Sequence, residues 1–308
     1  MRRDTRARLA AHGVRPRRGL GQSFLVAPGI AGRIVDAAEA AAGEGLDGAL
    51  VVEVGPGAGA LTEALIARAG RLLAIEVDSR LHALLAERFG CPPHVTWVLG
   101  DALTYDYPAE VARLARGRPA LVVANLPYAV ATPILLRLLD CGPLFRALVI
   151  MLQREVADRL VARPGTKTYG PLTLAVQARA AARRLFTVPP SAFHPRPAVA
   201  SAVVAVVPHG APPVPLAEWP AVRAVVRAAF GQRRKMLRQA LVGPDLGLST
   251  AEAARALDAA GIDGRRRGET VSLEEFRRLA RAAVPAGGAA PPLPGDAGRV
   301  PADDRRGD

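Results

Sequence analysis

Short apolar runs recur along the chain up to about residue 207, and most of them are followed by a helical pattern. Continuous apolar runs bounded by turn residues are typical of buried strands in a parallel sheet. The pattern therefore predicts an α/β fold whose strands are joined by helices. The predicted strands are 49–54, 71–75, 95–99, 120–124, 144–152 and 199–207, and the predicted helices are 28–42, 60–69, 79–89, 133–139, 153–163 and 172–182.

A helical region follows a proline-rich stretch. A helix is predicted over 216–229, and Ser249 with Glu252 and Ser272 with Glu275 each fit a capping box. The last residues are Gly, Pro, Ala and Asp with little apolar bulk, which predicts disorder. The predicted organisation is a basic arm over 1–18, an α/β domain over 19–207, a linker over 208–215, a helical domain over 216–284 and a disordered tail over 285–308.

Composition narrows the class of protein. The 308 residues contain two cysteines, Cys91 and Cys141, and no CxxC pair, so we expect neither a disulfide framework nor a metal site. No apolar run is long enough to span a membrane, and the N-terminus lacks the apolar centre of a signal peptide. A cytosolic enzyme is therefore expected.

The net charge of +13 favours a polyanionic partner, most simply nucleic acid. Only Lys167 and Lys235 among the 41 basic residues are lysines, and a GC-rich genome would also produce this arginine bias. The arginine-rich segment 2–18 is interpreted either as a solvated tail or as an RNA-contacting arm that orders on binding.

A glycine-rich turn follows the first predicted strand. Gly55, Gly57 and Gly59 give the pattern GxGxG, which lets a ligand approach the backbone at a helix N-terminus. The dinucleotide fingerprint GxGxxG would need glycine at Ala60. This turn alone does not separate a nicotinamide cofactor from S-adenosylmethionine, and a purely structural turn is the alternative.

Carboxylates follow the next two predicted strands. Glu76 lies about twenty residues past the glycine turn, where a carboxylate can accept both hydroxyls of a ribose. Asp78 is predicted to cap the following helix. Asp101 follows the third strand, where it suits either a hydrogen bond from an adenine amine or a turn cap.

The fourth strand runs into Asn125-Leu126-Pro127-Tyr128. The Asn125 oxygen and the carbonyl of Leu126 or Pro127 can accept both hydrogens of an exocyclic amine, and the Tyr128 ring can stack on a flat base. An ordinary turn is the alternative for this segment. Phe193, in a proline-rich loop, is interpreted either as the second face of a base sandwich or as a buried anchor for that loop.

Taken together, these segments resemble the KsgA-type small-subunit ribosomal RNA adenine N6-dimethyltransferases over about residues 17–283. The matching blocks include GQSFL (21–25), VEVGPGAGALT (52–62), IEVD (75–78), GDAL (100–103), NLPY (125–128), FGQRRKMLRQAL (230–241) and RRRGETVSLEEF (265–276). The last two blocks favour this family over the Erm-type large-subunit methylases.

The resemblance implies a Rossmann-like class I methyltransferase sheet with a small C-terminal helical domain that binds RNA. It implies dimethylation of N6 of two adjacent adenines in a hairpin loop near the 3′ end of small-subunit (16S) ribosomal RNA. S-adenosylmethionine is the implied methyl donor, without a metal. The implied partner is the immature small subunit, with a role in its biogenesis, and the protein is expected to be a monomer.

The resemblance also implies roles for individual residues. Expected cofactor contacts are Ser23, Leu25, Gly55, Gly57, Glu76, Asp101, Ala102 and Asn125. Expected catalytic residues are Asn125, Leu126, Pro127, Tyr128 and Phe193. Expected RNA contacts, with solvated faces as the alternative, are Arg233, Arg234, Lys235, Arg238, Arg265 and Arg266. Two positions depart from the family pattern: Ser23 replaces asparagine or histidine, and Ala200 replaces aspartate.

Three competing interpretations remain at this point. A nicotinamide oxidoreductase fits the fold alone but lacks the full glycine fingerprint. A ribosome-assembly factor could dock on immature subunits and methylate only incidentally. An Erm-type resistance methylase would act on large-subunit RNA.

Overall fold

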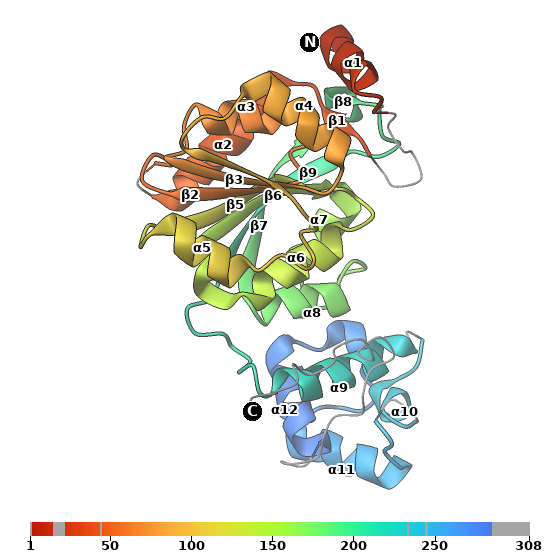
Figure 1. Cartoon of the computed structure of the whole chain (residues 1–308). Coiled ribbons are helices and arrows are strands. Elements are labelled where there is room, and N and C mark those ends of the chain that lie inside the picture. The colour runs from red at the N-terminus through yellow and green to blue at the C-terminus, as the bar shows by residue number, and fades with distance from the viewer. Residues whose placement is uncertain (1, 15–21, 44, 233, 244–245, 285–308) are drawn as a thin grey trace, which may run out of the picture. The chain divides into compact units, whose positions relative to one another are not determined.

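The computed structural model describes residues 2–14, 22–43, 45–232, 234–243 and 246–284. The chain divides into two compact units (Figure 1). The sheet unit contains Met1–Ala162 and Ala175–Pro212, and the helical unit contains Arg163–Leu174 and Pro213–Asp308. The predicted tail, the end of the predicted arm (15–18) and Arg233 lie outside the described residues.

A seven-stranded sheet forms the centre of the sheet unit, in the order β4-β3-β2-β5-β6-β9-β7. The parallel strands are β2 (Leu50–Val54), β3 (Arg71–Glu76), β4 (Val95–Leu99), β5 (Ala120–Asn125) and β6 (Ala147–Gln153), and the antiparallel ones are β7 (Ala180–Val188) and β9 (Ser201–Pro208). The strand order reverses between β2 and β5. Ligands of open α/β sheets bind at the carboxyl ends of strands at such a reversal.

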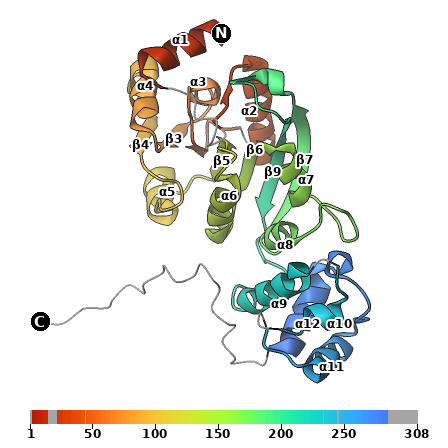
Figure 2. The same cartoon turned by 90° about the vertical axis from the view of Figure 1, so that its right-hand side faces the viewer.

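Helices cover both faces of the sheet (Figures 1 and 2). One face carries α2 (Pro28–Ala42), α3 (Ala60–Ile66) and α4 (Ser79–Phe89), and the other carries α5 (Tyr107–Ala115) and α6 (Ala131–Asp140). Ile34, Val35 and Ala38 of α2 are fully buried in the sheet unit's core with Val51 and Val149. This spacing places one apolar face of α2 on the sheet, as the sequence pattern predicts.

A second, two-stranded sheet joins distant segments. Strand β1 (Phe24–Leu25) pairs antiparallel with β8 (Phe193–His194), so that Leu25 lies opposite Phe193. The 3₁₀ turns η2 (Gly142–Leu144) and η3 (Pro190–Ala192) precede β6 and β8, and two short helices, α7 (Arg154–Leu160) and α8 (Pro171–Gln177), follow β6. The pairing brings the segment before α2 to the proline-rich loop.

Several elements differ from the sequence-based predictions. The predicted helix over 172–182 ends at Gln177, and β7 begins at Ala180. Helix α5, capped by Asp106 through a 3.1 Å bond from the Ala109 N–H, was not predicted. The arm contains α1 (Arg2–Ala11), which lies against α4 (Figure 2). Buried Leu9 and Val14 cluster with Leu81 and Leu84, so residues 2–14 are docked rather than a solvated tail.

The helical unit contains α9 (Trp219–Gly231), α10 (Leu237–Ala240), α11 (Thr250–Ala260), the 3₁₀ turn η4 (Gly268–Thr270) and α12 (Leu273–Ala283). Both predicted capping boxes are present, at the starts of α11 and α12. Phe230 of α9 and Phe276 of α12 have ring centroids 6.1 Å apart. The unit therefore has an apolar core of its own.

A segment from the middle of the chain completes this core. The Tyr169 ring lies 6.3 Å from that of Phe230, and its hydroxyl donates a 2.8 Å bond to the Val271 carbonyl. Residues 163–174 thus pack with the helical unit, although the predicted α/β domain included them. None of the helices described is long and apolar enough to cross a membrane.

Candidate active site

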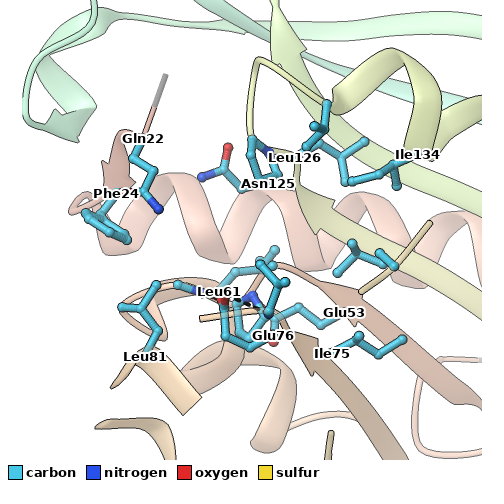
Figure 3. A pocket seen from close by; sticks show the side chains of 18 of the residues that line it. Gln22, Phe24, Glu53, Leu61, Ile75, Glu76, Leu81, Asn125, Leu126 and Ile134 are labelled. Carbon is cyan, nitrogen blue, oxygen red and sulfur yellow. Dashed lines mark hydrogen bonds between the residues drawn. The ribbon is translucent and has the colours of Figure 1, made fainter. Parts of the chain in front are cut away.

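A cavity of about 320 Å³ opens at the carboxyl ends of β2, β3 and β5 (Figure 3). This volume lies within the usual range for small-molecule sites. Every predicted cofactor contact lines it: Ser23, Leu25, Gly55, Gly57, Glu76, Asp101, Ala102 and Asn125. Leu126, Pro127 and Tyr128 line it as well. The fold therefore brings together residues that the sequence separates by about a hundred positions.

The glycine turn shapes one wall of the cavity. Gly55, Gly57 and Gly59 have φ angles of 66°, 58° and 80°, a region that side chains other than glycine rarely adopt. A Cβ atom on Gly57 would lie 3.0 Å from Phe24 Cδ1. The turn therefore requires glycine both for its backbone conformation and for the close packing of β1.

Glu76, at the end of β3, is held by backbone groups. Its carboxylate accepts bonds from the N–H groups of Gly57, Val77 and Asp78 at 3.1, 3.0 and 3.0 Å. Only 6 % of the residue is exposed, and this burial raises its pKa although the three bonds oppose the shift. A carboxylate offers about four acceptor positions, so capacity remains for a ligand hydroxyl.

The two aspartates serve the local turns as well. Asp78 caps α4 by accepting a 2.9 Å bond from the Arg80 N–H, which confirms that prediction. Asp101 accepts a 2.9 Å bond from the Leu103 N–H and also lines the cavity. Both interpretations of Asp101 are therefore compatible with its position.

The loop after β5 is fixed from several sides. Leu126 is buried, and its N–H donates to the Met151 carbonyl at 3.3 Å. The Pro127 carbonyl accepts a 3.1 Å bond from the Val130 N–H. Tyr128 Oη lies 2.6 Å from Ser201 Oγ on β9, and burial raises the pKa of this tyrosine. The Tyr128 ring is thus anchored at its far end.

Ser201 was not identified from the sequence. It is fully buried, and 73 positions separate it from Tyr128. Its neighbour Ala200 is one of the two positions that depart from the family pattern. The Ala200 carbonyl accepts a 2.9 Å hydrogen bond from the Arg154 N–H. An aspartate side chain at position 200 is not needed for this backbone contact.

Glu53, in the middle of β2, is the second functional candidate that sequence reasoning missed. It lines the cavity, is 1 % exposed, and its Oε2 makes no hydrogen bond with the described residues. Burial raises the pKa of Glu53 to about 8; the nearby Thr62 hydroxyl opposes this shift and the Glu76 charge adds to it. The signal in the sequence was a lone carboxylate within an apolar strand.

The charged residues among those lining the cavity are all acidic. They are Glu53, Glu76 and Asp101, and none of the described lining residues is lysine, arginine or histidine. Such a cavity suits a ligand with positive charge, such as the sulfonium of S-adenosylmethionine.

Phe193 is buried, which is compatible with its interpretation as an anchor for the proline-rich loop. The residue is 2 % exposed, belongs to the hydrophobic core with Leu25 and Val203, and does not line the cavity. Its pairing with Leu25 in the two-stranded sheet explains this burial. The base sandwich of Phe193 with Tyr128 stays a prediction.

The basic clusters of the helical unit lie beside each other. The Leu237 N–H donates to the Arg266 carbonyl at 2.8 Å, and the Arg238 N–H donates to the Gly264 carbonyl at 3.0 Å. The exposed side chains include Arg234, Lys235 and Arg238. Arg265 pairs with Asp263 at 3.0 Å, and Arg266 is hydrogen-bonded to Glu275. The backbone bonds therefore join two separate charge runs into one surface.

The sequence profile of a family described as ribosomal RNA adenine dimethylase matches residues 13–281. The chain belongs to this family. Two relatives described as ribosomal RNA small subunit methyltransferase A are those of Geobacillus thermodenitrificans and Rhodospirillum rubrum, 44 % and 46 % identical over 91 % of this chain. The matches cover 95 % and 92 % of these relatives. Membership in this family implies an S-adenosylmethionine-dependent methyltransferase.

Two solved structures share the fold. A dimethyladenosine transferase from Plasmodium falciparum has a TM-score of 0.65 at 24 % identity and covers 83 % of this chain and 95 % of its own. The 23S rRNA methyltransferase ErmE has a TM-score of 0.63 at 25 % identity, and the match covers 84 % of this chain and 98 % of ErmE. The predicted α/β methyltransferase fold with C-terminal helices is thereby confirmed.

Proposed function

We propose that this protein transfers methyl groups from S-adenosylmethionine to N6 of two adjacent adenines in a hairpin loop near the 3′ end of small-subunit ribosomal RNA. The observation that carries this proposal is the convergence of Asn125 and Tyr128 with three carboxyl groups on one cavity. The names of the relatives support the substrate class. We further propose that the protein acts in the cytosol, as a monomer, on immature small subunits.

The donor is expected to occupy the part of the cavity formed by the glycine turn, Glu76 and Asp101. Glu76 would accept the ribose hydroxyls, and Asp101 would accept the adenine amine of the donor. Gly55 and Gly57 have no side chains, so the donor can approach their backbone closely. Ser23, Leu25 and Ala102 complete the lining. The shorter Ser23 side chain is expected to contact the donor weakly.

Asn125 and Leu126 would orient the nucleophile. An adenine amine is a poor nucleophile because its lone pair is delocalised into the ring. Asn125 Oδ1 can accept one amine hydrogen. The Leu126 carbonyl is the better acceptor for the second, because the Pro127 carbonyl already accepts from the Val130 N–H. Two such bonds favour a pyramidal nitrogen whose lone pair points at the methyl group.

In the transfer, the N6 lone pair forms the new bond to the methyl carbon while the carbon–sulfur bond breaks and its electrons remain on sulfur. The proton on nitrogen becomes acidic once the nitrogen is methylated, so no carboxylate base is needed. Holding both partners in line supplies much of the acceleration, since well-oriented reactants gain roughly 7–11 kcal/mol.

Tyr128 is the proposed stacking platform for the flipped base. Stacking on an aromatic ring contributes about 1–3 kcal/mol per base. The bond from Tyr128 to Ser201 would hold the ring in a fixed orientation. Phe193 would act indirectly, by supporting β1 next to the cavity.

RNA recognition is assigned to the helical unit. Arg234, Lys235 and Arg238 are exposed there and are the proposed phosphate contacts. Arg265 and Arg266 would have to exchange an acidic partner within the chain for a phosphate. Arg233 belongs to the same sequence run but lies outside the described residues.

The test is transfer of labelled methyl groups to immature small subunits and, in parallel, to naked large-subunit RNA, followed by mapping of the modified base. Dimethyladenine on the small subunit alone is the expected result. The likeness to ErmE makes large-subunit RNA the informative comparison. Label on large-subunit RNA alone would contradict the proposed substrate, and tight subunit binding without label would favour an assembly factor.

A further inference from the structure

The arm helix α1 and the candidate active site share one hydrophobic cluster. Its buried members are Leu9, Val14, Phe24, Ala58, Leu81 and Leu84. Phe24, Ala58 and Leu81 also line the cavity, and Figure 3 shows the Phe24 and Leu81 side chains there. Leu9 and Val14 are not among the residues that line it. The arm therefore contributes to the packing of one cavity wall without being part of that wall.

The arm is held in place mainly by its two apolar side chains. Leu9 is the single large apolar residue among the ten residues of α1, and it is buried. Polar contacts are added by His12, whose Nε2 lies 2.9 Å from Glu87 Oε2, and by the Gly13 carbonyl, which accepts a 3.3 Å bond from Arg80. The Glu87 side chain is 76 % exposed, and exposed ion pairs contribute little. Apolar burial therefore dominates the docking.

Helix α1 is too short to be stable by itself. It has ten residues, and isolated helices shorter than about 12–15 residues are marginal in water. Residues 2–14 therefore depend on docking for their helical structure, and the arm has a docked and an undocked state. Terminal segments of this kind open at a much smaller free energy than the core of a protein. A ligand that binds the docked state better can shift this equilibrium.

We propose that Leu9 and Val14 are positioning residues of the cavity: the docked arm holds the wall at Phe24 and Leu81, so that arm docking and ligand binding favour each other. The inference rests on the proposed function, because the ligand is taken to be the methyl donor. Such coupling is reciprocal. The factor by which docking tightens the donor Kd equals the factor by which bound donor favours docking. Two separate measurements must therefore give the same number.

The first measurement is hydrogen exchange of the full chain with and without S-adenosylmethionine. The N–H groups of His12, Gly13 and Val14 donate to carbonyls of α1, so their exchange reports opening of the arm. Bound donor should slow this exchange by about tenfold, and by at most about a hundredfold when the donor is at 100 times its Kd. Amides of α11, in the helical unit, are the internal control and should not change.

The second measurement is the donor Kd of Leu9→Asp, determined by calorimetry. The new charge cannot stay in the apolar cluster, so the arm should undock. The donor Kd should weaken by the factor found from hydrogen exchange, about tenfold, while kcat at saturating donor stays within about twofold of the wild type. Ala7→Asp is the matched control, because Ala7 is exposed on the same helix. Neither its donor Kd nor the exchange of its arm should change.

Three outcomes would overturn this inference alone. The first is unchanged exchange of the α1 amides when the wild type binds the donor, which needs no variant. The second is the same donor Kd in Leu9→Asp and Ala7→Asp. The third is a loss of kcat in Leu9→Asp with an unchanged donor Kd, which would assign the arm to RNA instead. Failure of the wild type to bind S-adenosylmethionine would overturn the proposed function with it.

Discussion

At the scale of single residues, the bond between Tyr128 and Ser201 ties the substrate loop to the antiparallel part of the sheet. Removing the Ser201 hydroxyl leaves the Tyr128 ring in place but frees its orientation. Loss of one hydrogen bond of this kind costs about 1 kcal/mol. We therefore expect Ser201→Ala to lower kcat by about fivefold to tenfold while the donor Kd stays unchanged, measured by single-turnover transfer and by calorimetry.

Tyr128→Phe provides the control for this prediction, because it removes the same bond from the other side. If the bond is the cause, the double variant should be no slower than the slower single variant. Independent, additive losses would show that Ser201 does not act by positioning Tyr128.

Asn125 is expected to act on the nucleophile rather than on the donor. Asn125→Ala should lower turnover by about 10²–10³-fold, as is typical when one oriented polar contact to a reacting group is lost. The donor Kd should change only a few-fold. Asp101→Ala should behave in the opposite way, with weaker donor binding and a smaller loss of kcat at saturating donor. Equal loss of turnover and donor binding in Asn125→Ala would contradict the assigned role.

The residues recognised from the strand pattern share one property: each lies at or just after the carboxyl end of a strand. Glu76, Asp101 and Asn125 come directly after apolar runs, so their convergence on one edge follows from a parallel sheet. Ser201 and Glu53 lie within β9 and β2, and their importance depends on a distant partner or on the lack of one. Such three-dimensional relations leave no local pattern in the sequence.

At the scale of elements, the missed strand β7 shows where the hydrophobic pattern fails. β7 is the last strand of the sheet, and Arg183 and Arg184 interrupt its alternation. Charged side chains on an edge strand prevent pairing with other chains. They also break the hydrophobic pattern by which a strand is predicted from the sequence. The alanine-rich start of β7 also favours a helical interpretation. The interiors of the central strands are apolar apart from Glu53 in β2, and all of these strands were predicted.

Helices α9 and α12 are joined by Glu218, which receives bonds from Arg277 and Arg281 at 2.8 and 2.7 Å. These two arginines lower the pKa of Glu218 to about 2. The contribution to stability is therefore present above pH 4.5 and is lost as the pH falls toward 2. Because the side chain is 28 % exposed, we expect Glu218→Gln to destabilise the unit by only about 1 kcal/mol at pH 7.

Hydrogen exchange of α12 amides at pH 7 measures this effect, and acid unfolding curves of the wild type and the variant should converge only as the pH falls to about 2. Glu274→Gln is the matched control. Glu274 lies 3.9 Å from Arg277 and is more exposed, so its replacement should be nearly neutral. An equal effect of the two variants would show that the bonds of Glu218 contribute nothing specific.

At the scale of the whole molecule, the charge of the cavity lining differs in sign from the net charge of the chain. The chain has a net charge of +13, yet the charged side chains that line the cavity are carboxyl groups. The basic surface of the helical unit is formed where the segment of α10 meets residues 264–266. Under the proposed function, a cationic methyl donor and a polyanionic RNA would meet different surfaces, and substitutions on one should leave binding at the other unchanged.

This separation predicts how the basic surface contributes to RNA binding. Replacing both Lys235 and Arg238 with alanine should weaken binding to every RNA sequence and reduce the slope of log K against log salt by about 2, since each phosphate contact contributes about 0.7–0.9. The donor Kd should not change. Arg265→Ala is the control. Asp263 already pairs with that arginine, so the slope should change by less than the contribution of one phosphate contact. Filter binding over a salt series measures the slope for the wild type, the double variant and Arg265→Ala. An unchanged slope in the double variant would place the phosphate contacts elsewhere.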